Sequence, residues 1–303
     1  MRVCVLGIGA VGGYYGGRLA YHSAWDVIFI ARGPAFSYLK NNPLEVKSVN
    51  GNFSVKVPVF EEVPPDFHPD IIIICTKSYD TLQAIETLKN SDTPCTRILC
   101  IQNGIENEKK LEDYKFKGWV LGGVAFIASQ AVEPGKIVHQ SVGGLGIGAM
   151  DEHNKDFAKL LVDEFNRCKV ETRYLENVLF HKWKKLMWNA AFNSLTTITG
   201  KTVIQLLNNK KTLDIIRSTM EEVKIVANKE GYDLCDKDIE DMISASYDVG
   251  DYKTSMLLDL ERKKPTENDD ISGAVVRYGK KHNISTPFNL AFYSIISLLE
   301  QSA

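Results

Sequence analysis

The feature that most constrains this chain is a glycine pattern close to its first residue. Gly7, Gly9 and Gly12 form G-x-G-x-x-G directly after the apolar run RVCVLG and directly before a helix-like stretch. A tight turn, close approach of the backbone to a pyrophosphate and close helix packing each require a missing side chain, and a helix N-terminus attracts an anion. The pattern therefore predicts a dinucleotide site, against the alternative of a glycine-rich turn without a ligand. The residues expected to form it are Gly7, Ile8, Gly9, Ala10, Val11 and Gly12.

Short apolar runs alternate with helical stretches over the first half of the chain. Four runs are continuously apolar at their centres, as strands covered by helices on both faces are. They are residues 2–7, 26–32, 70–77 and 97–104. This alternation predicts a mostly parallel sheet built from βαβ units. Further strands, partly antiparallel, are expected to extend the sheet around a turn at Glu133–Gly135. They are residues 119–129, 136–140 and 143–150.

The pattern of apolar residues changes near residue 175. Beyond that point, helical periodicity replaces the short strand-like runs. Apolar residues recur every three or four positions in the stretches 178–195 and 213–231. The sequence therefore predicts an α/β protein of two domains with no flexible linker. Residues 1–173 are expected to form a Rossmann dinucleotide-binding domain, and residues 174–303 an all-α substrate and catalytic domain. A cleft between two such domains is the expected position of the site.

The charge and the cysteine content of the chain indicate which kind of molecule it binds. The formal net charge is -2 and the pI is near 6.3, so the sequence gives no reason to expect a nucleic-acid surface. The six cysteines contain no C-x-x-C pair, which favours reduced thiols, and the start resembles neither a signal peptide nor a membrane span. We expect a cytoplasmic protein that acts on a small molecule, with no metal implied. Its oligomeric state, a homodimer among the options, stays open.

The residue that follows the second predicted strand distinguishes between dinucleotides. An NAD enzyme usually carries an acid there, about 20 residues beyond the glycines. In this chain the strand DVIFIA ends in Arg32 instead, and a guanidinium can bind a 2′-phosphate through two hydrogen bonds. Lys77, after DIIIICT, is expected to add a second cation at the same edge. The sequence thus predicts NADPH or NADP and disfavours S-adenosylmethionine, although Arg32 could also be a solvated surface residue.

Asn103 and Gly104 follow the fourth predicted strand and reach the same edge of the sheet. Asn103 could contact the ribose or nicotinamide of a cofactor, while Gly104 would let the backbone pass close to it. The alternative is a simple Asn-Gly turn.

Three polar residues recur at a spacing of four in the first helical stretch of the second half. Lys185, Asn189 and Asn193 would share one helical face, amid Trp183 and Trp188. A lysine partly desolvated by tryptophans has a lowered pKa, which makes it a better proton donor to a ketone that receives a hydride. The alternative is a lysine that snorkels to solvent, with Asn193 ending the helix.

A further polar cluster spans residues 254–273, where Thr266 is expected to cap a helix. Such a run can also be no more than a charged, solvated helix start. Taken in order, however, these motifs resemble the 2-dehydropantoate 2-reductase, or ketopantoate reductase, family along essentially the whole chain. The motifs are GIGAVGG, Arg32, TKS at 76–78, QNG at 102–104, residues 183–197, residues 255–267, and the tail from Gly273 to Pro287 with HNISTP.

The resemblance implies the 6-phosphogluconate-dehydrogenase-like group, in which a helical domain follows a Rossmann domain. It implies NADPH-dependent reduction of 2-dehydropantoate to (R)-pantoate, a step towards pantothenate and coenzyme A. The family's cofactor residues fall on Arg32 and Lys77 for the 2′-phosphate, and on Asn103 for cofactor binding and domain closure. These assignments are expectations taken from the resemblance.

The resemblance also implies roles for the second half. Lys185 matches the general acid of the family. The residues expected to bind the carboxylate, ketone and hydroxyl of the substrate are Asn189, Asn193, Ser255 and Glu267.

Four positions depart from the family pattern and bear on the substrate. They are Tyr252, where Asn is common, Ser194, where Pro is common, and Asn268 and Ser272 within TENDDISG. Two alternatives therefore stay open: a related reductase of another 2-oxo acid, and a non-catalytic NADP-binding sensor. The sensor has little need for Lys185 and Glu267 together.

Overall fold

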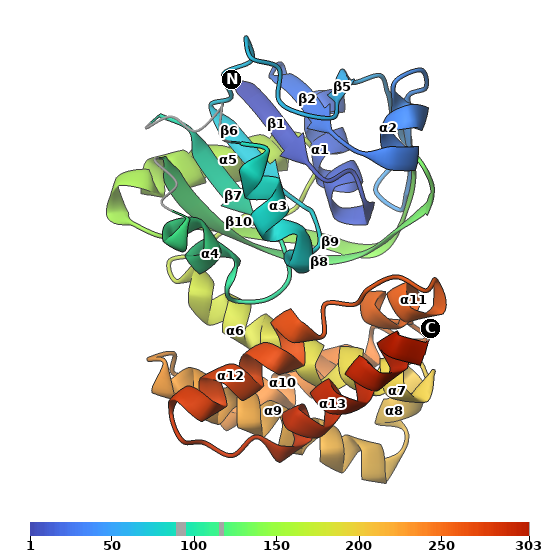
Figure 1. Ribbon diagram of the computed structural model, residues 1–303, viewed down its shortest axis with the longest axis vertical. Helices are drawn as coiled ribbons and strands as arrows, with labels where there is room; N and C mark the ends of the chain where they lie inside the picture. The colour runs from blue at the N-terminus through green and yellow to red at the C-terminus, as the bar shows by residue number, and fades with distance from the viewer. Residues whose placement is uncertain (89–94, 115–117, 303) are drawn as a thin grey trace. The chain divides into compact units, whose positions relative to one another are not determined.

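The computed structural model describes residues 1–88, 95–114 and 118–302 of the chain (Figure 1). The chain divides into two compact units. Unit 1 comprises Met1–Gln102 and Asn107–Val178, and unit 2 comprises Asn103–Glu106 and Leu179–Ala303. Unit 1 holds a mostly parallel sheet with helices on its faces, whereas unit 2 is helical. The predicted fold class, a Rossmann domain followed by an all-α domain, is confirmed.

The sheet of unit 1 runs in the order β4-β3-β9-β8-β7-β6-β1-β2-β5, and β10 pairs with β9. Its pairs are parallel except β3–β4 and β8–β9, which are antiparallel. The strands are β1 (Arg2–Leu6), β2 (Asp26–Ile30), β3 (Leu44–Ser48), β4 (Phe53–Val55), β5 (Val59–Phe60), β6 (Ile71–Ile74), β7 (Arg97–Cys100), β8 (Trp119–Glu133), β9 (Lys136–Ala149) and β10 (Thr172–Tyr174). Strands β2 and β6 lie on opposite sides of β1, so the strand order reverses there, and such a switch point is where open α/β sheets bind ligands.

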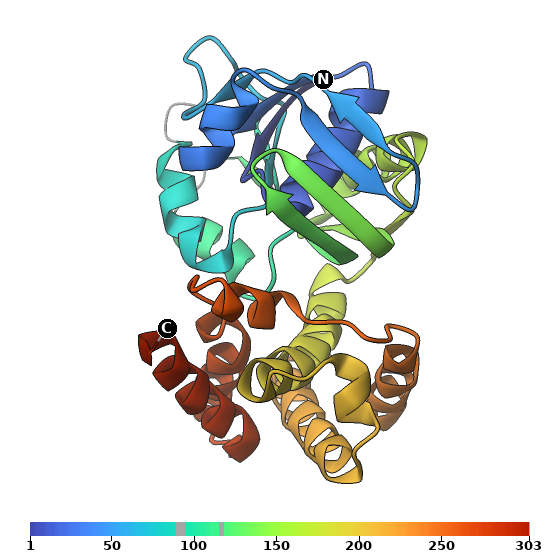
Figure 2. The ribbon, with the colours of Figure 1, turned by 90° about the vertical axis from the view of Figure 1, so that its right-hand side faces the viewer.

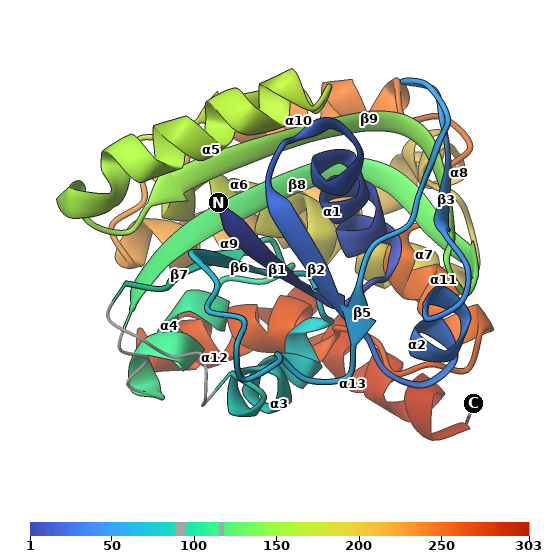
Figure 3. The ribbon, with the colours of Figure 1, turned by 90° about the horizontal axis from the view of Figure 1, so that it is seen from above.

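Strand β1 is apolar and buried from Val3 to Leu6 because helices cover both faces of the sheet (Figure 3). Val3 and Val5 belong to the core that includes α1 (Ala10–His22) and α5 (Lys155–Arg167). Cys4 and Leu6 belong to the core of the opposite face, with α3 (Thr81–Glu86) and α4 (Asn107–Asp113). Alternate residues of one strand are therefore buried in two different cores.

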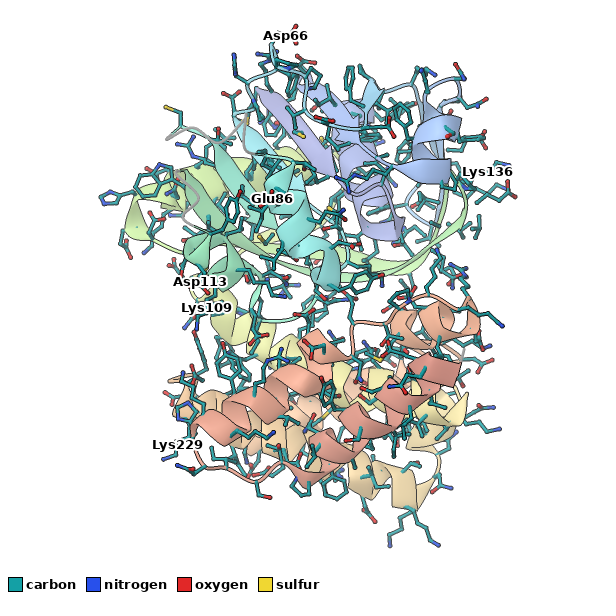
Figure 4. All side chains as sticks on the ribbon, viewed as in Figure 1. Asp66, Glu86, Lys109, Asp113, Lys136 and Lys229 are labelled. Carbon is teal, nitrogen blue, oxygen red and sulfur yellow. The ribbon has the colours of Figure 1, made fainter. Side chains whose placement is uncertain are left out.

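The predicted antiparallel extension forms as one long hairpin. The runs expected at 136–140 and 143–150 are a single strand, β9, which irregularities in its pairing with β8 bend without breaking. Strand β3 pairs in parallel with the beginning of β9 (Figure 2). At the hairpin turn, Lys136, labelled in Figure 4, forms an ion pair of 2.7 Å with Glu133.

The remaining helices of unit 1 are short connections. They are α2 (Gly33–Leu39), the 3₁₀ helix η1 (Ser78–Asp80) and the 3₁₀ helix η2 (Glu152–Asn154). None of the helices in the described ranges is long and apolar enough to cross a membrane. No disulfide joins any of the six cysteines, all of which lie in described parts of the chain.

Unit 2 is built around the long helix α9 (Lys210–Lys229), whose Ile216, Met220 and Val223 are fully buried. Most of α6 (Val178–Trp188) also belongs to this unit. The other helices are α7 (Ser194–Thr199), α8 (Val203–Leu207), α10 (Asp236–Tyr247), α11 (Ser255–Glu261), α12 (Ala274–Lys281) and α13 (Pro287–Ser302). Two π-helical segments interrupt the regular helices: η3 (Asn189–Asn193), between α6 and α7, and η4 (Asp269–Gly273), before α12. The regular helix predicted over 178–195 is thus wound more loosely near its end, at Asn189–Asn193.

Candidate functional site

The three glycines after β1 differ in what fills the space beside them. Gly7 has a φ of +87°, and a Cβ there would lie 2.7 Å from the backbone nitrogen of Thr76. A Cβ on Gly12 would overlap the carbonyl oxygen of Gly7. At Gly9, the first residue of the turn into α1, an added Cβ would meet no described protein atom within 4 Å. Packing explains Gly7 and Gly12, whereas the open space at Gly9 fits close approach of a ligand to the backbone.

The two predicted cations follow the strands that flank β1. Leu6, at the end of β1, pairs with Ile30 of β2 and with Ile74 of β6. Arg32 lies two residues after Ile30 and is exposed, and Lys77 lies three residues after Ile74 and is half-buried. Both cations therefore lie at the sheet edge where the glycine turn begins. This edge has the donors and the positive charge that a dinucleotide phosphate requires.

Gln102 connects the loop after β6 to the end of β7. Its buried side-chain nitrogen Nε2 donates hydrogen bonds to the carbonyl oxygens of Thr76, at 3.1 Å, and Lys77, at 3.2 Å. It also donates to the hydroxyl of Thr81, at the start of α3, at 2.8 Å. Hydrogen bonds from the side-chain amide of Gln102 thus connect the TKS and QNG motifs. They hold the backbone of Lys77 in place.

A chain of hydrogen bonds joins Lys185, Asn103 and Glu267, all of which belong to unit 2. The Nζ of Lys185 donates to Oδ1 of Asn103 at 2.8 Å, and Nδ2 of Asn103 donates to Oε2 of Glu267 at 2.9 Å. Glu267 is only 5 % exposed. The structure therefore brings together three predicted site residues that the sequence separates by up to 164 positions.

Asn103 reaches this cluster because four residues of the first half are anchored to unit 2. Gly104 turns the chain with a φ of +88°, and Ile105 is buried in the hydrophobic core of unit 2. Glu106 then pairs with Arg277 of α12 at 2.6 Å, and Arg277 also pairs with Asp269 at 3.0 Å. The sequence predicts Asn103 at the edge of the sheet beside the cofactor. In the structure its amide lies between a cation and a carboxylate of unit 2.

The surroundings of Lys185 shift its proton affinity. Loss of solvation, the largest cause, and the positive charge of Lys182 together lower the pKa of Lys185 to about 8, although the carboxylate of Glu267 opposes both. Lys182 lies one helical turn earlier on α6 and is 4 % exposed. The sequence predicts a lowered pKa caused by tryptophans, but it gives no sign of the buried second lysine. The buried like charge of Lys182 beside Lys185 therefore could not be predicted from the sequence.

The two asparagines that follow Lys185 lie in η3. Asn189 and Asn193 are 4 % and 2 % exposed, and Oδ1 of Asn193 is buried without a hydrogen-bond partner among the described residues. The interpretation of Asn193 as a helix end is wrong, because α7 continues to Thr199 and ends at Gly200, whose φ is +66°. A buried amide oxygen without a partner is costly unless a ligand or water satisfies it.

A pair of serine hydroxyls links the two π-helical segments. Ser194 directly follows η3 and Ser272 lies within η4, and their Oγ atoms are 2.9 Å apart in a fully buried contact. Both serines are among the four positions that differ from the family pattern. The two differences therefore form a single contact. π-helical segments are rare and occur frequently at functional sites. Neither segment has a periodicity that would reveal it in the sequence.

Ser255 is placed beside this region by a second hydroxyl pair. The Oγ1 atoms of Thr254 and Thr196 lie 2.6 Å apart and connect the start of α11 to α7. Ser255, the first residue of α11, is partly exposed. Helix α11 and η4 both contact η3, so the segments that carry Asn189, Asn193 and Ser255 converge within unit 2, and Glu267 lies two residues before η4.

The remaining departures contribute to packing. Nδ2 of Asn268 donates to the carbonyl oxygen of Tyr293 in α13 at 2.9 Å. Tyr252 packs against the core of unit 2, and its carbonyl oxygen accepts a hydrogen bond from Val203. The hydroxyl of Thr266 accepts from the backbone nitrogen of Asn268 at 3.2 Å, near the predicted helix start.

Comparison with known proteins finds similar sequences over nearly the whole chain. The family model for ketopantoate reductase PanE/ApbA matches residues 3–152, and the model for its C-terminal part matches residues 177–300. The 2-dehydropantoate 2-reductase of Pyrococcus abyssi is 30 % identical over 98 % of this chain and 97 % of its own length.

Solved structures of similar sequence share the fold. A PanE/ApbA family ketopantoate reductase from Ralstonia eutropha has a TM-score of 0.91 at 29 % identity, covering 100 % of this chain and 99 % of that one. A 2-dehydropantoate 2-reductase from Geobacter metallireducens has the same TM-score of 0.91 and 29 % identity, and covers 100 % of both chains. With two matched regions that span most of its length, this chain belongs to the ketopantoate reductase PanE/ApbA family.

Proposed function

We propose that this chain catalyses the NADPH-dependent reduction of 2-dehydropantoate to (R)-pantoate, a step of pantothenate and coenzyme A biosynthesis. The observation that carries the proposal is the hydrogen-bonded chain of Lys185, Asn103 and Glu267, in which the lysine has a lowered pKa. Family membership supports the same reaction. In this proposal, residues 1–173 bind the cofactor and residues 174–303 bind the substrate and supply the acid.

The edge of the sheet in unit 1 has the features that a dinucleotide phosphate needs. The turn from Gly7 to Gly12 would hold the pyrophosphate at the start of α1, where the open space at Gly9 permits close approach. Arg32 and Lys77 would bind the 2′-phosphate, which distinguishes NADPH from NADH. When bound, NADPH supplies the hydride that reduces the ketone carbon.

Lys185 would supply the proton that the ketone oxygen requires. With a pKa of about 8, its ammonium group is mostly protonated at neutral pH and is more acidic than an ordinary lysine. Asn103 holds the ammonium nitrogen from one side, and Glu267 holds Asn103, so the donor has a defined direction. Lys185 is partly exposed and can regain a proton from solvent after each turnover.

Four polar residues of unit 2 would bind the substrate. Its carboxylate, ketone and hydroxyl need donors and acceptors, and the unsatisfied amide oxygen of Asn193 is suited to accept from the hydroxyl. The proposed residues are Asn189, Asn193, Ser255 and Glu267. Tyr252 keeps open a related reductase for a different 2-oxo acid, because an aromatic ring there changes the shape and polarity of the region.

The test compares two substrates that differ in a single hydroxyl. Oxidation of NADPH is followed with 2-dehydropantoate and with 3,3-dimethyl-2-oxobutanoate, which lacks only the terminal hydroxyl group, and the chiral product is identified. A site built to bind that hydroxyl should prefer 2-dehydropantoate by about a hundredfold or more in kcat/KM. Equal kcat/KM values for the two acids would favour the alternative of another 2-oxo acid.

A further inference from the structure

A carboxylate lies at the same sheet edge as the two proposed phosphate-binding cations. Asp80 is the last residue of η1, which follows β6 and Lys77. Since Ile30 and Ile74 both pair with Leu6, Arg32 and Asp80 follow strand ends that flank the same residue of β1. The described chain therefore carries an acid next to the position where the sequence predicts only positive charge.

Arg32 and Asp80 interact through space without touching. Partial burial, the larger effect, raises the pKa of Asp80, and the guanidinium of Arg32 acts to lower it. No ion pair of 4.0 Å or less joins the two among the described residues, so Arg32 keeps its donors for a ligand. The guanidinium therefore lies in the field of the carboxylate while it stays available.

No role in the local structure explains why residue 80 carries a carboxylate. Asp80 occupies the position before the first turn of α3, but its side chain makes no capping hydrogen bond there. The side chain is half-buried. Among the described residues, the carboxylate of Asp80 neither caps a helix nor forms an ion pair. Such a carboxylate contributes little to stability, so an effect on a ligand is the simpler explanation.

We infer that Asp80 is a specificity-determining residue that works against a phosphate on the 2′-oxygen of the cofactor ribose. Its negative charge repels a phosphate dianion, whereas a ribose hydroxyl can donate a hydrogen bond to it. Arg32 and Lys77 act in the opposite direction. The preference of the enzyme for NADPH is therefore smaller than the two cations alone would produce. This inference rests on the proposed cofactor site in unit 1.

The test measures binding of two nucleotide fragments and needs no turnover. Isothermal titration with 2′,5′-ADP and 5′-AMP, which differ in the 2′-phosphate, is performed on the full chain as wild type and as Asp80→Asn. We expect Asp80→Asn to bind 2′,5′-ADP about threefold to tenfold more tightly at low salt, with 5′-AMP unchanged or weaker. This gain should shrink in about 0.5 M salt, because screening weakens a through-space effect but not a change of fold.

Three further variants show whether the effect is specific to the charge of Asp80. Asp156→Asn removes the same charge from an exposed position on α5, and its affinity for both nucleotides should equal that of the wild type. Asp80→Ser removes the charge with a different side chain and should reproduce the gain, which guards against a folding defect specific to Asn. Arg32→Gln should weaken 2′,5′-ADP but not 5′-AMP.

The outcomes separate this inference from the proposed function. If 2′,5′-ADP binds the wild type more tightly than 5′-AMP does, yet both Asp80 variants leave its affinity unchanged or lower it, the inference is overturned and the cofactor site stands. If the wild type binds neither fragment, the cofactor site and the inference both fail.

Discussion

The Nζ of Lys185 lies 2.8 Å from Oδ1 of Asn103, a residue 82 positions earlier in the chain. The same amide donates to Glu267, so a neutral side chain separates a cation from a carboxylate. Without Asn103, the ammonium group and the carboxylate would be free to approach and form a direct pair. Such a pair would raise the pKa of Lys185 and draw its ammonium group away from the ketone oxygen that we propose it protonates.

Asn103→Ala should lower kcat about tenfold to a hundredfold, because the hydrogen bond that directs a charged donor is lost. If Asn103 acts mainly through Lys185, the dissociation constant of NADPH should change much less. Steady-state kinetics and NADPH titration on the same preparation separate the two effects. A large loss of NADPH affinity with kcat unchanged would instead assign Asn103 to the cofactor.

The reduction rate should fall with rising pH through the pKa of Lys185. The general acid must be protonated, and its pKa is about 8, so kcat/KM for reduction should drop about tenfold per pH unit above that value. The reverse oxidation needs the free amine and should rise through the same pH. A reduction profile that stays flat to pH 10 would contradict this assignment of the acid.

Lys182→Met should move that descending limb to higher pH. The substitution removes the positive charge that lowers the pKa of Lys185 and keeps a side chain of similar length. The measurement is the pH dependence of kcat/KM, which a purely structural role of Lys182 would not displace. Lys184→Met is the matched control, since Lys184 lies on the same helix but pairs with Asp238 at 2.6 Å. An unchanged midpoint in the Lys182 variant would show that its charge does not act on Lys185.

Alanine at Gly9 and at Gly12 should have different consequences. Gly12→Ala places a Cβ against the carbonyl oxygen of Gly7 and should cost roughly 1–3 kcal/mol or more in unfolding free energy. Gly9→Ala meets open space, so stability should stay within about 1 kcal/mol of the wild type. The same Gly9 substitution should nevertheless weaken NADPH binding about tenfold or more, because the methyl group occupies the space left for the pyrophosphate. Denaturant unfolding and cofactor titration test both variants, and unimpaired NADPH binding by Gly9→Ala would be inconsistent with the proposed site.

The buried hydroxyl pair of Ser194 and Ser272 should appear as an energetic coupling. Each single substitution to Ala leaves one buried hydroxyl without its partner, at a cost of about 1–3 kcal/mol. The double variant removes both hydroxyls and should cost less than the sum of the two single changes. A double-mutant cycle in denaturant measures the difference. Strict additivity would mean that the two segments are not coupled through this contact.

The sheet could be predicted from the sequence because buried parallel strands have a simple signature. The continuous apolar runs match β1, β2, β6 and β7, although the last three predicted runs continue two to four residues beyond the observed strands. Those additional residues are the loops that carry Arg32, Lys77 and Asn103. A polar residue at the end of an apolar run thus marks the point where the strand ends and a loop with a proposed site residue begins.

The interior of unit 2 could not be predicted in the same way. The periodicity around Asn189 and Asn193 fits a regular helix as well as a π-helical one, since the two differ in hydrogen bonding and not in residue type. Similarly, Asn103 belongs to unit 2 because of contacts with residues as far away as Glu267. The burial of Lys182 also depends on tertiary packing. Local sequence contains none of this information.

The proposed function is best tested by the loss of nicotinamide absorbance when the purified protein is mixed with NADPH and 2-dehydropantoate, with Lys185→Ala measured in parallel. If Lys185 is the general acid, the wild type should oxidise NADPH rapidly and the variant should lose about 10²- to 10⁴-fold in kcat while it still binds NADPH. Equal rates for the two proteins, or no turnover by a wild type that binds NADPH tightly, would contradict the proposal.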